Sequence, residues 1–258
     1  MSIVSSKTSG GVCTISLDDV ERKNSLTPQL LAELMDACDA AEADDSVRVI
    51  VLTNSGNTFC AGANLAQRSG RSASEEPVRQ VEASDLFGRF LNSPKPYVGK
   101  INGHCVAGGM GIAASVDISI AIDTAKMGFT EVRIGVAPAM IAVVCLPKMR
   151  PADARAAILR GNRFLAPEAV RMGLINAAVP ADQLDAAVDE VVADLLAGGP
   201  AALAAAKEII AQVPPMPVAD AFELMSRRSA EMFRSDEARE GMAAYLEKRP
   251  ASWIPKST

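Results

Sequence analysis

Two glycine-rich segments and one glutamate are the residues of this sequence whose types and spacing best suit acid–base chemistry. The first segment covers residues 59–65 (FCAGANL), the second covers 103–111 (GHCVAGGMG), and the glutamate is Glu131. Each segment follows an apolar, strand-like run, and glycine lets backbone N–H groups point outward at a ligand oxygen. Two such donors from different turns can hold a developing oxyanion, and a carboxylate beside them can move a proton.

Glu131 lies in an otherwise apolar neighbourhood, between residues 127–130 (MGFT) and 132–135 (VRIG). Desolvation there raises the pKa of a carboxyl group, which suits a general acid or base. The alternative interpretation is an ion pair between Glu131 and Arg133 on a solvated face. The spacing alone favours neither interpretation.

A dinucleotide-binding turn is a competing interpretation of the second segment. Residues 109–114 (GMGIAA) fit the pattern G-x-G-x-x-A, and Glu131 follows at a suitable distance. The next strand, however, is expected to begin near Ile118. That leaves no room for the crossover helix of about ten residues or more that a parallel strand–helix–strand unit needs. We therefore do not expect a dinucleotide site.

The remaining reactive side chains are better explained by structure than by chemistry. His104 is the single histidine, so it has no relay partner, and we expect backbone groups to satisfy it. Cys60 and Cys105 have no visible base to activate them, which favours small apolar packing. One histidine also gives little material for a zinc site, and no metal site is predicted.

Regular elements must position these residues, and their patterns predict an alternation of strands and helices. Thr27 as N-cap and Pro28 at the first helical position mark the first helix. A strand precedes each glycine segment, and the first of them, residues 47–53, is a continuous β-rich run that is typical of a buried strand. In order, the sequence predicts a hairpin over 3–17, the helix from Thr27, a strand over 47–53, a surface loop over 67–76, a helix over about 77–91, a strand over 97–101, a short helix over 108–115 and a strand over 118–122.

The chain from residue 139 onward is predicted to be mostly helical. We expect Asp182 to cap a helix that ends at residues 198–200 (GGP). Residues 214–217 (PPMP) form a stiff break before a last helical piece.

Composition limits the classes of function. The 258 residues are 49% hydrophobic and carry a net charge of −5, with no basic cluster, so nucleic-acid binding is not expected. The sequence has no run of about 18 apolar residues, so we expect no membrane span. The five cysteines lack C-x-x-C spacing, and residues 1–7 lack the layout of a signal peptide. Reduced, buried thiols in a cytoplasmic protein are therefore expected.

Several segments, taken in order, resemble the crotonase superfamily, which is the enoyl-CoA hydratase/isomerase family. The resemblance runs from about residue 22 to residue 253. It implies an α/β fold with a spiral of ββα units over 1–198, which carries the CoA and acyl sites, and a C-terminal helical trimerisation region over 199–258. The matching segments are 23–26 (KNSL), 59–65, 102–109, 161–164 (GNRF) with 169–179, 235–242 (SDEAREGM) and 247–250 (EKRP).

The resemblance implies acyl-CoA thioesters as substrates and no cofactor beyond their coenzyme A. The backbone N–H groups of Ala63 and Gly108 match the oxyanion hole of the family, and Glu131 matches a catalytic glutamate. An assembly of three subunits, or of six as a dimer of trimers, is also implied.

Positions that bind the coenzyme follow from the same resemblance. Coenzyme A is expected along Lys23, Ala61 and Leu65. Tyr245 and Lys248 match C-terminal positions that often reach the coenzyme of an adjacent subunit, where a lysine offers a point charge to phosphate.

Gly111 departs from the pattern of two glutamates around one water, because it stands where the first glutamate aligns. Our leading hypothesis is water addition to a 2-enoyl-CoA, including branched or unusual ones, with Glu131 as proton carrier and Gly111 in a reshaped acyl pocket. A second hypothesis is a double-bond isomerase that uses Glu131 alone. A third, of another class, is an acyl-CoA-binding protein with little catalysis.

Overall fold

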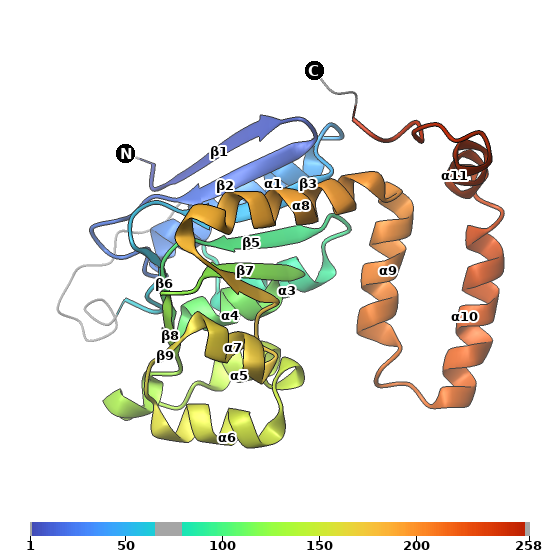
Figure 1. Ribbon diagram of the computed structural model, residues 1–258. Helices are drawn as coiled ribbons and strands as arrows, with labels where there is room; N and C mark the ends of the chain where they lie inside the picture. Colours follow the sequence, from blue (N-terminus) through green and yellow to red (C-terminus); the bar gives the residue numbers. More distant parts are fainter. Residues whose placement is uncertain (1, 65–78, 256–258) are drawn as a thin grey trace.

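The computed structural model describes residues 2–64 and 79–255, and its strands form two sheets (Figure 1). The larger sheet has the order β1-β2-β3-β5-β7-β10 and is parallel except for the β1–β2 hairpin. Its strands are β1 Val4–Ser9, β2 Val12–Leu17, β3 Val49–Asn54, β5 Tyr97–Ile101, β7 Ile118–Ile122 and β10 Ala177–Val179.

The smaller sheet has the order β4-β6-β8-β9, in which only β9 runs antiparallel to its neighbour. Three times in succession, one strand enters the large sheet and the next enters the small sheet before a helical segment follows. This repetition is the spiral of ββα units that the sequence led us to expect. The strands are β4 Thr58–Cys60, β6 His104–Val106, β8 Lys126–Gly128 and β9 Phe164–Leu165.

The two faces of the large sheet bury alternate side chains of the same strand, as the two-residue period of a strand requires. Ile50 and Leu52 of β3 belong to the main core with helix α1 (Pro28–Ala43). Val49 and Val51 pack instead with α8 (Leu184–Ala197). Helices therefore cover both faces, which explains why β3 is apolar almost throughout.

Most of the predicted N-terminal elements are confirmed. The hairpin turns at Gly10 and Gly11, whose φ angles are +57° and +83°. Thr27 is the N-cap of α1, and its Oγ1 accepts the N–H of Leu30 at 3.1 Å. Helix α3 (Ala83–Asn92) begins later than expected, because the Asp85 carboxylate accepts the backbone N–H of Glu82 and sets the start there. The predicted loop over 67–76 lies outside the described residues.

The C-terminal half is mainly helical, as predicted, with two corrections. Asp182 does not cap α8, because it lies inside the short 3-10 helix η3 (Ala181–Gln183) and Gln183 takes the N-cap position. The short strands β9 and β10 were not expected. The other elements are α4 Gly108–Ser115, η1 Glu131–Ile134, α5 Ala139–Cys145, η2 Leu146–Lys148, α6 Pro151–Arg160, α7 Ala166–Met172, α9 Pro200–Gln212, α10 Val218–Met232 and α11 Asp236–Leu246.

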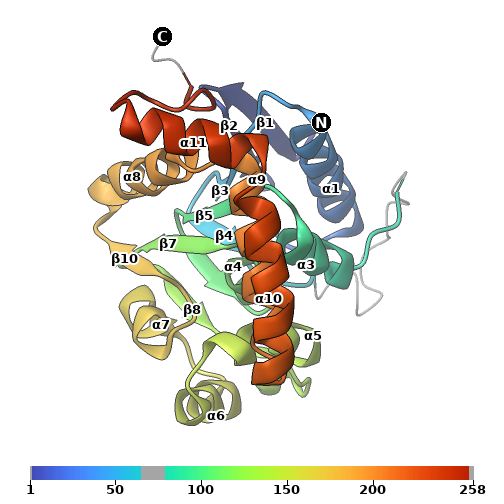
Figure 2. The same ribbon diagram turned by 90° about the vertical axis from the view of Figure 1, so that its right-hand side faces the viewer.

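Helices α9, α10 and α11 form an arm beside the two sheets, and α9 and α10 run antiparallel (Figures 1 and 2). The predicted break over 214–217 separates them. Lys207 of α9 anchors the arm, because its ammonium bonds the carboxylate of Asp117 at 2.6 Å and the carbonyl of Phe90 at 3.1 Å. Within the described part of the chain, no helix has the length and apolar character to cross a membrane.

Candidate active site

The two glycine segments touch each other at their backbones. A side chain on Gly62 would place its Cβ 2.7 Å from the backbone nitrogen of Gly108. Gly62 also has a φ angle of +81°, which favours glycine. Leu26 holds the first segment in place, since its N–H donates to the carbonyl of Gly62 at 2.8 Å. The structure therefore brings Ala63, the next residue, beside Gly108.

The second segment enters helix α4 through an unusual backbone conformation. Ala107, the N-cap, has φ 50° and ψ −123°, a region that residues with a side chain rarely adopt. Its N–H is held by the carbonyl of Gly128 at 3.0 Å. A strained residue of this kind persists where its surroundings over-determine it, and such residues gather at functional sites. The following residue, Gly108, is the first of α4, where backbone N–H groups have no partner within the helix.

Glu131 begins the 3-10 helix η1 and is half-buried. Burial raises the pKa of its carboxyl group above the ordinary value of 4.5. Its Oε2 is buried without a hydrogen-bond partner among the described residues. The charge of Glu131 adds to the burial that raises the pKa of the Cys145 thiol, at the end of α5. An unpaired, desolvated carboxyl group is suited to proton transfer.

The alternative ion pair with Arg133 does not form. The Arg133 guanidinium turns away and donates to the carbonyls of Gly161, at 2.8 Å from Nε, and of Arg160, at 3.2 Å from Nη2. Glu131 therefore keeps its apolar surroundings although a cation lies two residues away.

Gly111 is enclosed by apolar side chains from two other helices. A Cβ on Gly111 would lie 2.5 Å from Cζ of Phe87 and 2.7 Å from Cγ2 of Ile141. Both side chains are buried, and contacts this short are not sustained by a real Cβ. A carboxylic acid at this position would have to displace them. Sequence reasoning identified Gly111, but no sequence pattern identified Phe87 and Ile141 as the residues that fill its space.

The residues expected to bind the coenzyme are brought together only in part. The carbonyl of Lys23 accepts the N–H of Ala61 at 3.1 Å, and Lys23 itself is exposed with a φ angle of 54°. Leu65 lies outside the described residues. Tyr245, on α11, is 84% exposed, and Lys248 follows the same helix. Figure 1 shows α11 at the opposite end of the molecule from β6, so α11 lies far from the second glycine segment of its own chain.

The histidine and the cysteines have the structural roles that were predicted for them. His104 begins β6, and its Nδ1 accepts the backbone N–H of Lys126 at 3.1 Å. Burial, followed by the charges of Lys126 and Arg163, lowers its pKa, which favours the neutral ring. Burial raises the pKa of Cys60 to about 12 and that of Cys105 well above its usual range, so both thiols are protonated and packed in the core.

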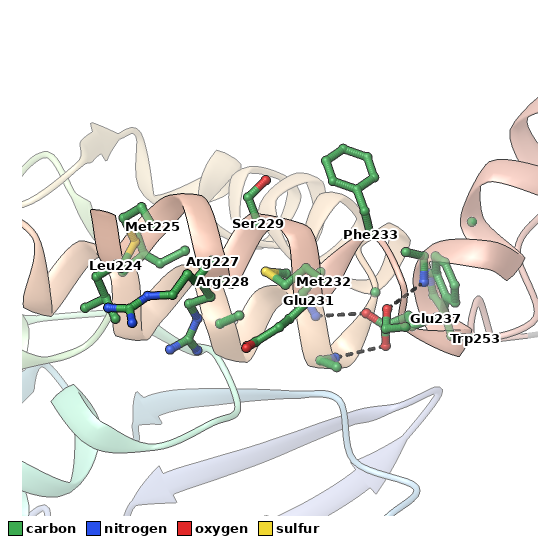
Figure 3. Close-up of a pocket in the computed structure, with 18 residues that line it drawn as sticks. Leu224, Met225, Arg227, Arg228, Ser229, Glu231, Met232, Phe233, Glu237 and Trp253 are labelled. Atoms are coloured by element: carbon green, nitrogen blue, oxygen red, sulfur yellow. Dashed lines mark hydrogen bonds between the residues drawn. The ribbon is translucent and has the colours of Figure 1, made fainter. Parts of the chain in front are cut away.

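A large apolar groove of about 1240 Å³ lies in the arm (Figure 3). Leu224, Met232 and Trp253 line it. Glu237 fixes α11 to the start of α9, because its carboxylate accepts the N–H groups of Ala201 and Ala202 at 3.0 and 2.8 Å. The groove is built for apolar contact rather than for proton transfer.

Comparisons with known proteins agree with this architecture. The family model described as "Enoyl-CoA hydratase/isomerase" matches residues 7–256. A putative enoyl-CoA hydratase of Thermus thermophilus is 34% identical over 244 residues, which cover 93% of this chain and 96% of the relative. A crotonyl-CoA hydratase of Syntrophomonas wolfei is 29% identical, over 90% of each chain.

A solved structure supports the assignment of the fold. The crystal structure of an enoyl-CoA hydratase from Shewanella pealeana superposes with a TM-score of 0.88 at 26% identity, over 97% of this chain and 96% of that one. The predicted crotonase-type α/β fold is thereby confirmed. With a family model matched over almost its whole length, the chain belongs to the enoyl-CoA hydratase/isomerase family.

Proposed function

We propose that this enzyme adds water to a 2-enoyl-CoA, with the N–H groups of Ala63 and Gly108 as the oxyanion hole and Glu131 as the proton carrier. The observation that carries the proposal is the unpaired, buried Oε2 of Glu131 in a chain whose two glycine turns meet at Gly62 and Gly108. The names of the relatives support the same reaction, since hydratases of enoyl-CoA and crotonyl-CoA are among them.

In the proposed reaction, the thioester oxygen accepts hydrogen bonds from the two backbone N–H groups. Glu131, as the carboxylate, takes a proton from water while the water oxygen bonds to C3. The electron pair of the C2=C3 bond moves to C2 and the thioester oxygen, so an enolate forms in the oxyanion hole. Glu131 then returns its proton to C2. A raised pKa favours this last step, because the carboxyl group must hold a proton before it donates it.

Isomerisation is the second candidate, and the surroundings of Gly111 favour it. Phe87 and Ile141 occupy the space beside Gly111, so a second acid has no place there. Glu131 alone is sufficient to take a proton from C2 of a 3-enoyl-CoA and return it to C4, which moves the double bond into conjugation. No water is consumed in this reaction.

We further propose a trimer, or a hexamer of two trimers, in which the arm of one subunit reaches its neighbour. The apolar groove in the arm supports this assembly, and so do exposed aromatic residues such as Phe222 and Tyr245, 74% and 84% exposed. In the assembly, Tyr245 and Lys248 would contact the coenzyme of the adjacent subunit, while Lys23, Ala61 and Leu65 bind it within their own. The five free, buried cysteines support a cytoplasmic location.

A panel of straight and branched 2-enoyl- and 3-enoyl-CoAs, with products identified by mass, tests the proposal. A gain of one water on a 2-enoyl-CoA is the expected result. Conversion of a 3-enoyl-CoA without any hydration would contradict the leading reaction and support the isomerase. Thermal stabilisation by acyl-CoAs without turnover of any member would contradict both reactions and indicate a binding protein.

A further inference from the structure

Arg133 lies two residues after Glu131 in the same 3-10 turn, but its side chain binds the end of a different helix, α6. Its Nε donates to the carbonyl of Gly161 at 2.8 Å, and its Nη2 donates to the carbonyl of Arg160 at 3.2 Å. Helix α6 ends at Arg160. The last carbonyls of a helix have no partner within it and carry a partial negative charge, so a guanidinium is well matched to them.

Gly161 completes the contact from the other side. It ends α6 with a φ angle of +56°, and its N–H donates to the carbonyl of Ala157 at 3.2 Å. A Cβ on Gly161 would lie 2.5 Å from Cγ2 of Val132 and 3.1 Å from Cγ of Arg133. The side chains of Val132 and Arg133 therefore pack directly against Gly161 at the end of α6.

The charged and titratable groups around Glu131 are few. From α5, the Cys145 thiol is the titratable group, and it donates to the carbonyl of Met110 at 3.6 Å while the charge of Glu131 contributes to its raised pKa. From α6, Arg160 presents its backbone carbonyl to Arg133. Burial is the cause of the raised pKa of Glu131, and neither arginine contributes to it. The cation of Arg133 is directed at the helix end and away from the carboxylate.

We propose that Arg133 is a positioning residue, which docks the 3-10 turn onto the end of α6 and thereby keeps the Glu131 carboxylate half-buried and out of an ion pair. The inference rests on the proposed function, in which Glu131 carries the proton. If Arg133 acted on Glu131 by its charge, removing that charge would raise the pKa of Glu131. If it acts by docking the turn, removing it admits water to the carboxylate and lowers the pKa.

The direction in which the pKa of Glu131 shifts when Arg133 is replaced distinguishes these two roles. Infrared titration follows the carboxyl stretch that Glu131→Gln removes, and it needs no turnover. We expect Arg133→Met to lower the pKa of Glu131 by about one unit. Arg133→Lys should have a smaller effect, because an ammonium group replaces only some of the hydrogen bonds that the guanidinium makes. Arg155→Met is the matched control, because Arg155 is an exposed arginine in the middle of α6. It should leave the pKa of Glu131 unchanged.

Kinetics supply the second readout. We expect Arg133→Met to lower kcat about tenfold with KM within about twofold, because the carboxylate is misplaced while the rest of the site is intact. An unchanged or raised pKa of Glu131 in Arg133→Met would overturn the proposal. If Arg133→Met does not fold, Gly161→Ala replaces it, since its methyl group pushes on Val132 and Arg133, and the same fall in pKa is expected. A fall in pKa in an enzyme that converts no enoyl-CoA would support the positioning role and refute the proposed function.

Discussion

At the scale of single residues, the site depends on the Glu131 carboxyl group, whose Oε2 is buried without a hydrogen-bond partner among the described residues. The apolar neighbours of Glu131 in the sequence made a raised pKa one of two interpretations, and the structure supports it, because burial raises the pKa of the carboxyl group. They were not sufficient to place Arg133. Its choice of partner depends on the end of α6, which lies far away in the sequence.

The raised pKa of Glu131 leads to a prediction about how stability depends on pH. Its pKa is higher in the folded chain than the ordinary value of 4.5, so ionising it works against folding. The stability that the protonated form contributes is full below the unfolded pKa and is lost as the pH rises through the folded pKa. We therefore expect Glu131→Gln to raise Tm by a few degrees at pH 7.

The same gain should disappear at pH values below the unfolded pKa, where the carboxyl is protonated in both states. Calorimetry across this pH range measures the difference between the two proteins. A lower Tm for Glu131→Gln at pH 7 would contradict the assignment of Glu131 as an unpaired buried acid.

The close packing around Gly111 leads to a second prediction. Gly111→Ala should lower the free energy of unfolding by about 1–3 kcal/mol, because the new Cβ collides with Phe87 and Ile141. Gly88→Ala is the matched control, since Gly88 is also helical but has no atom within 4 Å of its would-be Cβ. It should stabilise the fold by about 0.5–1 kcal/mol. Urea denaturation measures both, and an equal effect of the two variants would contradict the packing described at Gly111.

At the scale of elements, the strands and helices with a strong local pattern were predictable, and the strands of two or three residues were not. The cap at Thr27 and the buried run of β3 are encoded by neighbouring residues. Strands β9 and β10 have two and three residues, and they exist only because they pair with β8 and β7. Their sequence carries no period long enough to detect.

The anchor of the arm gives a prediction at this scale. The Lys207 side chain of α9 is 10% exposed and bonds Asp117, so Lys207→Met leaves the Asp117 carboxylate without its cation and two carbonyls without the ammonium donor. We expect a loss of about 2–4 kcal/mol in the free energy of unfolding. Lys100→Met is the control, because its partner Asp185 is 79% exposed, and it should cost no more than about 1 kcal/mol. Equal losses in urea denaturation would contradict the anchoring role.

At the scale of the whole molecule, the arm leaves an apolar groove and several large side chains uncovered. Sequence patterns predicted a helical C-terminal piece, but they could not show that α9 and α10 stand beside the sheets rather than on them (Figure 1). That arrangement depends on contacts such as Lys207 with Asp117 and Glu237 with the start of α9.

The assembly gives the corresponding prediction. Light scattering should report three or six times the mass of one chain. Phe233→Glu, at a side chain that is 67% exposed beside the groove, should yield monomers with an unchanged circular dichroism spectrum. Leu159→Glu, on α6 and 74% exposed, is the control outside the arm and should leave the assembly intact. A monomeric wild-type protein would contradict the proposed assembly.

The turnover of Glu131→Gln is the most direct test of the central claim, which is that one carboxyl group carries the proton. The isosteric amide keeps the shape of the site and removes the acid. We predict that kcat falls by about 10²–10⁴-fold on every enoyl-CoA that the wild type converts, while acyl-CoAs still raise Tm. Full turnover by Glu131→Gln would contradict the account.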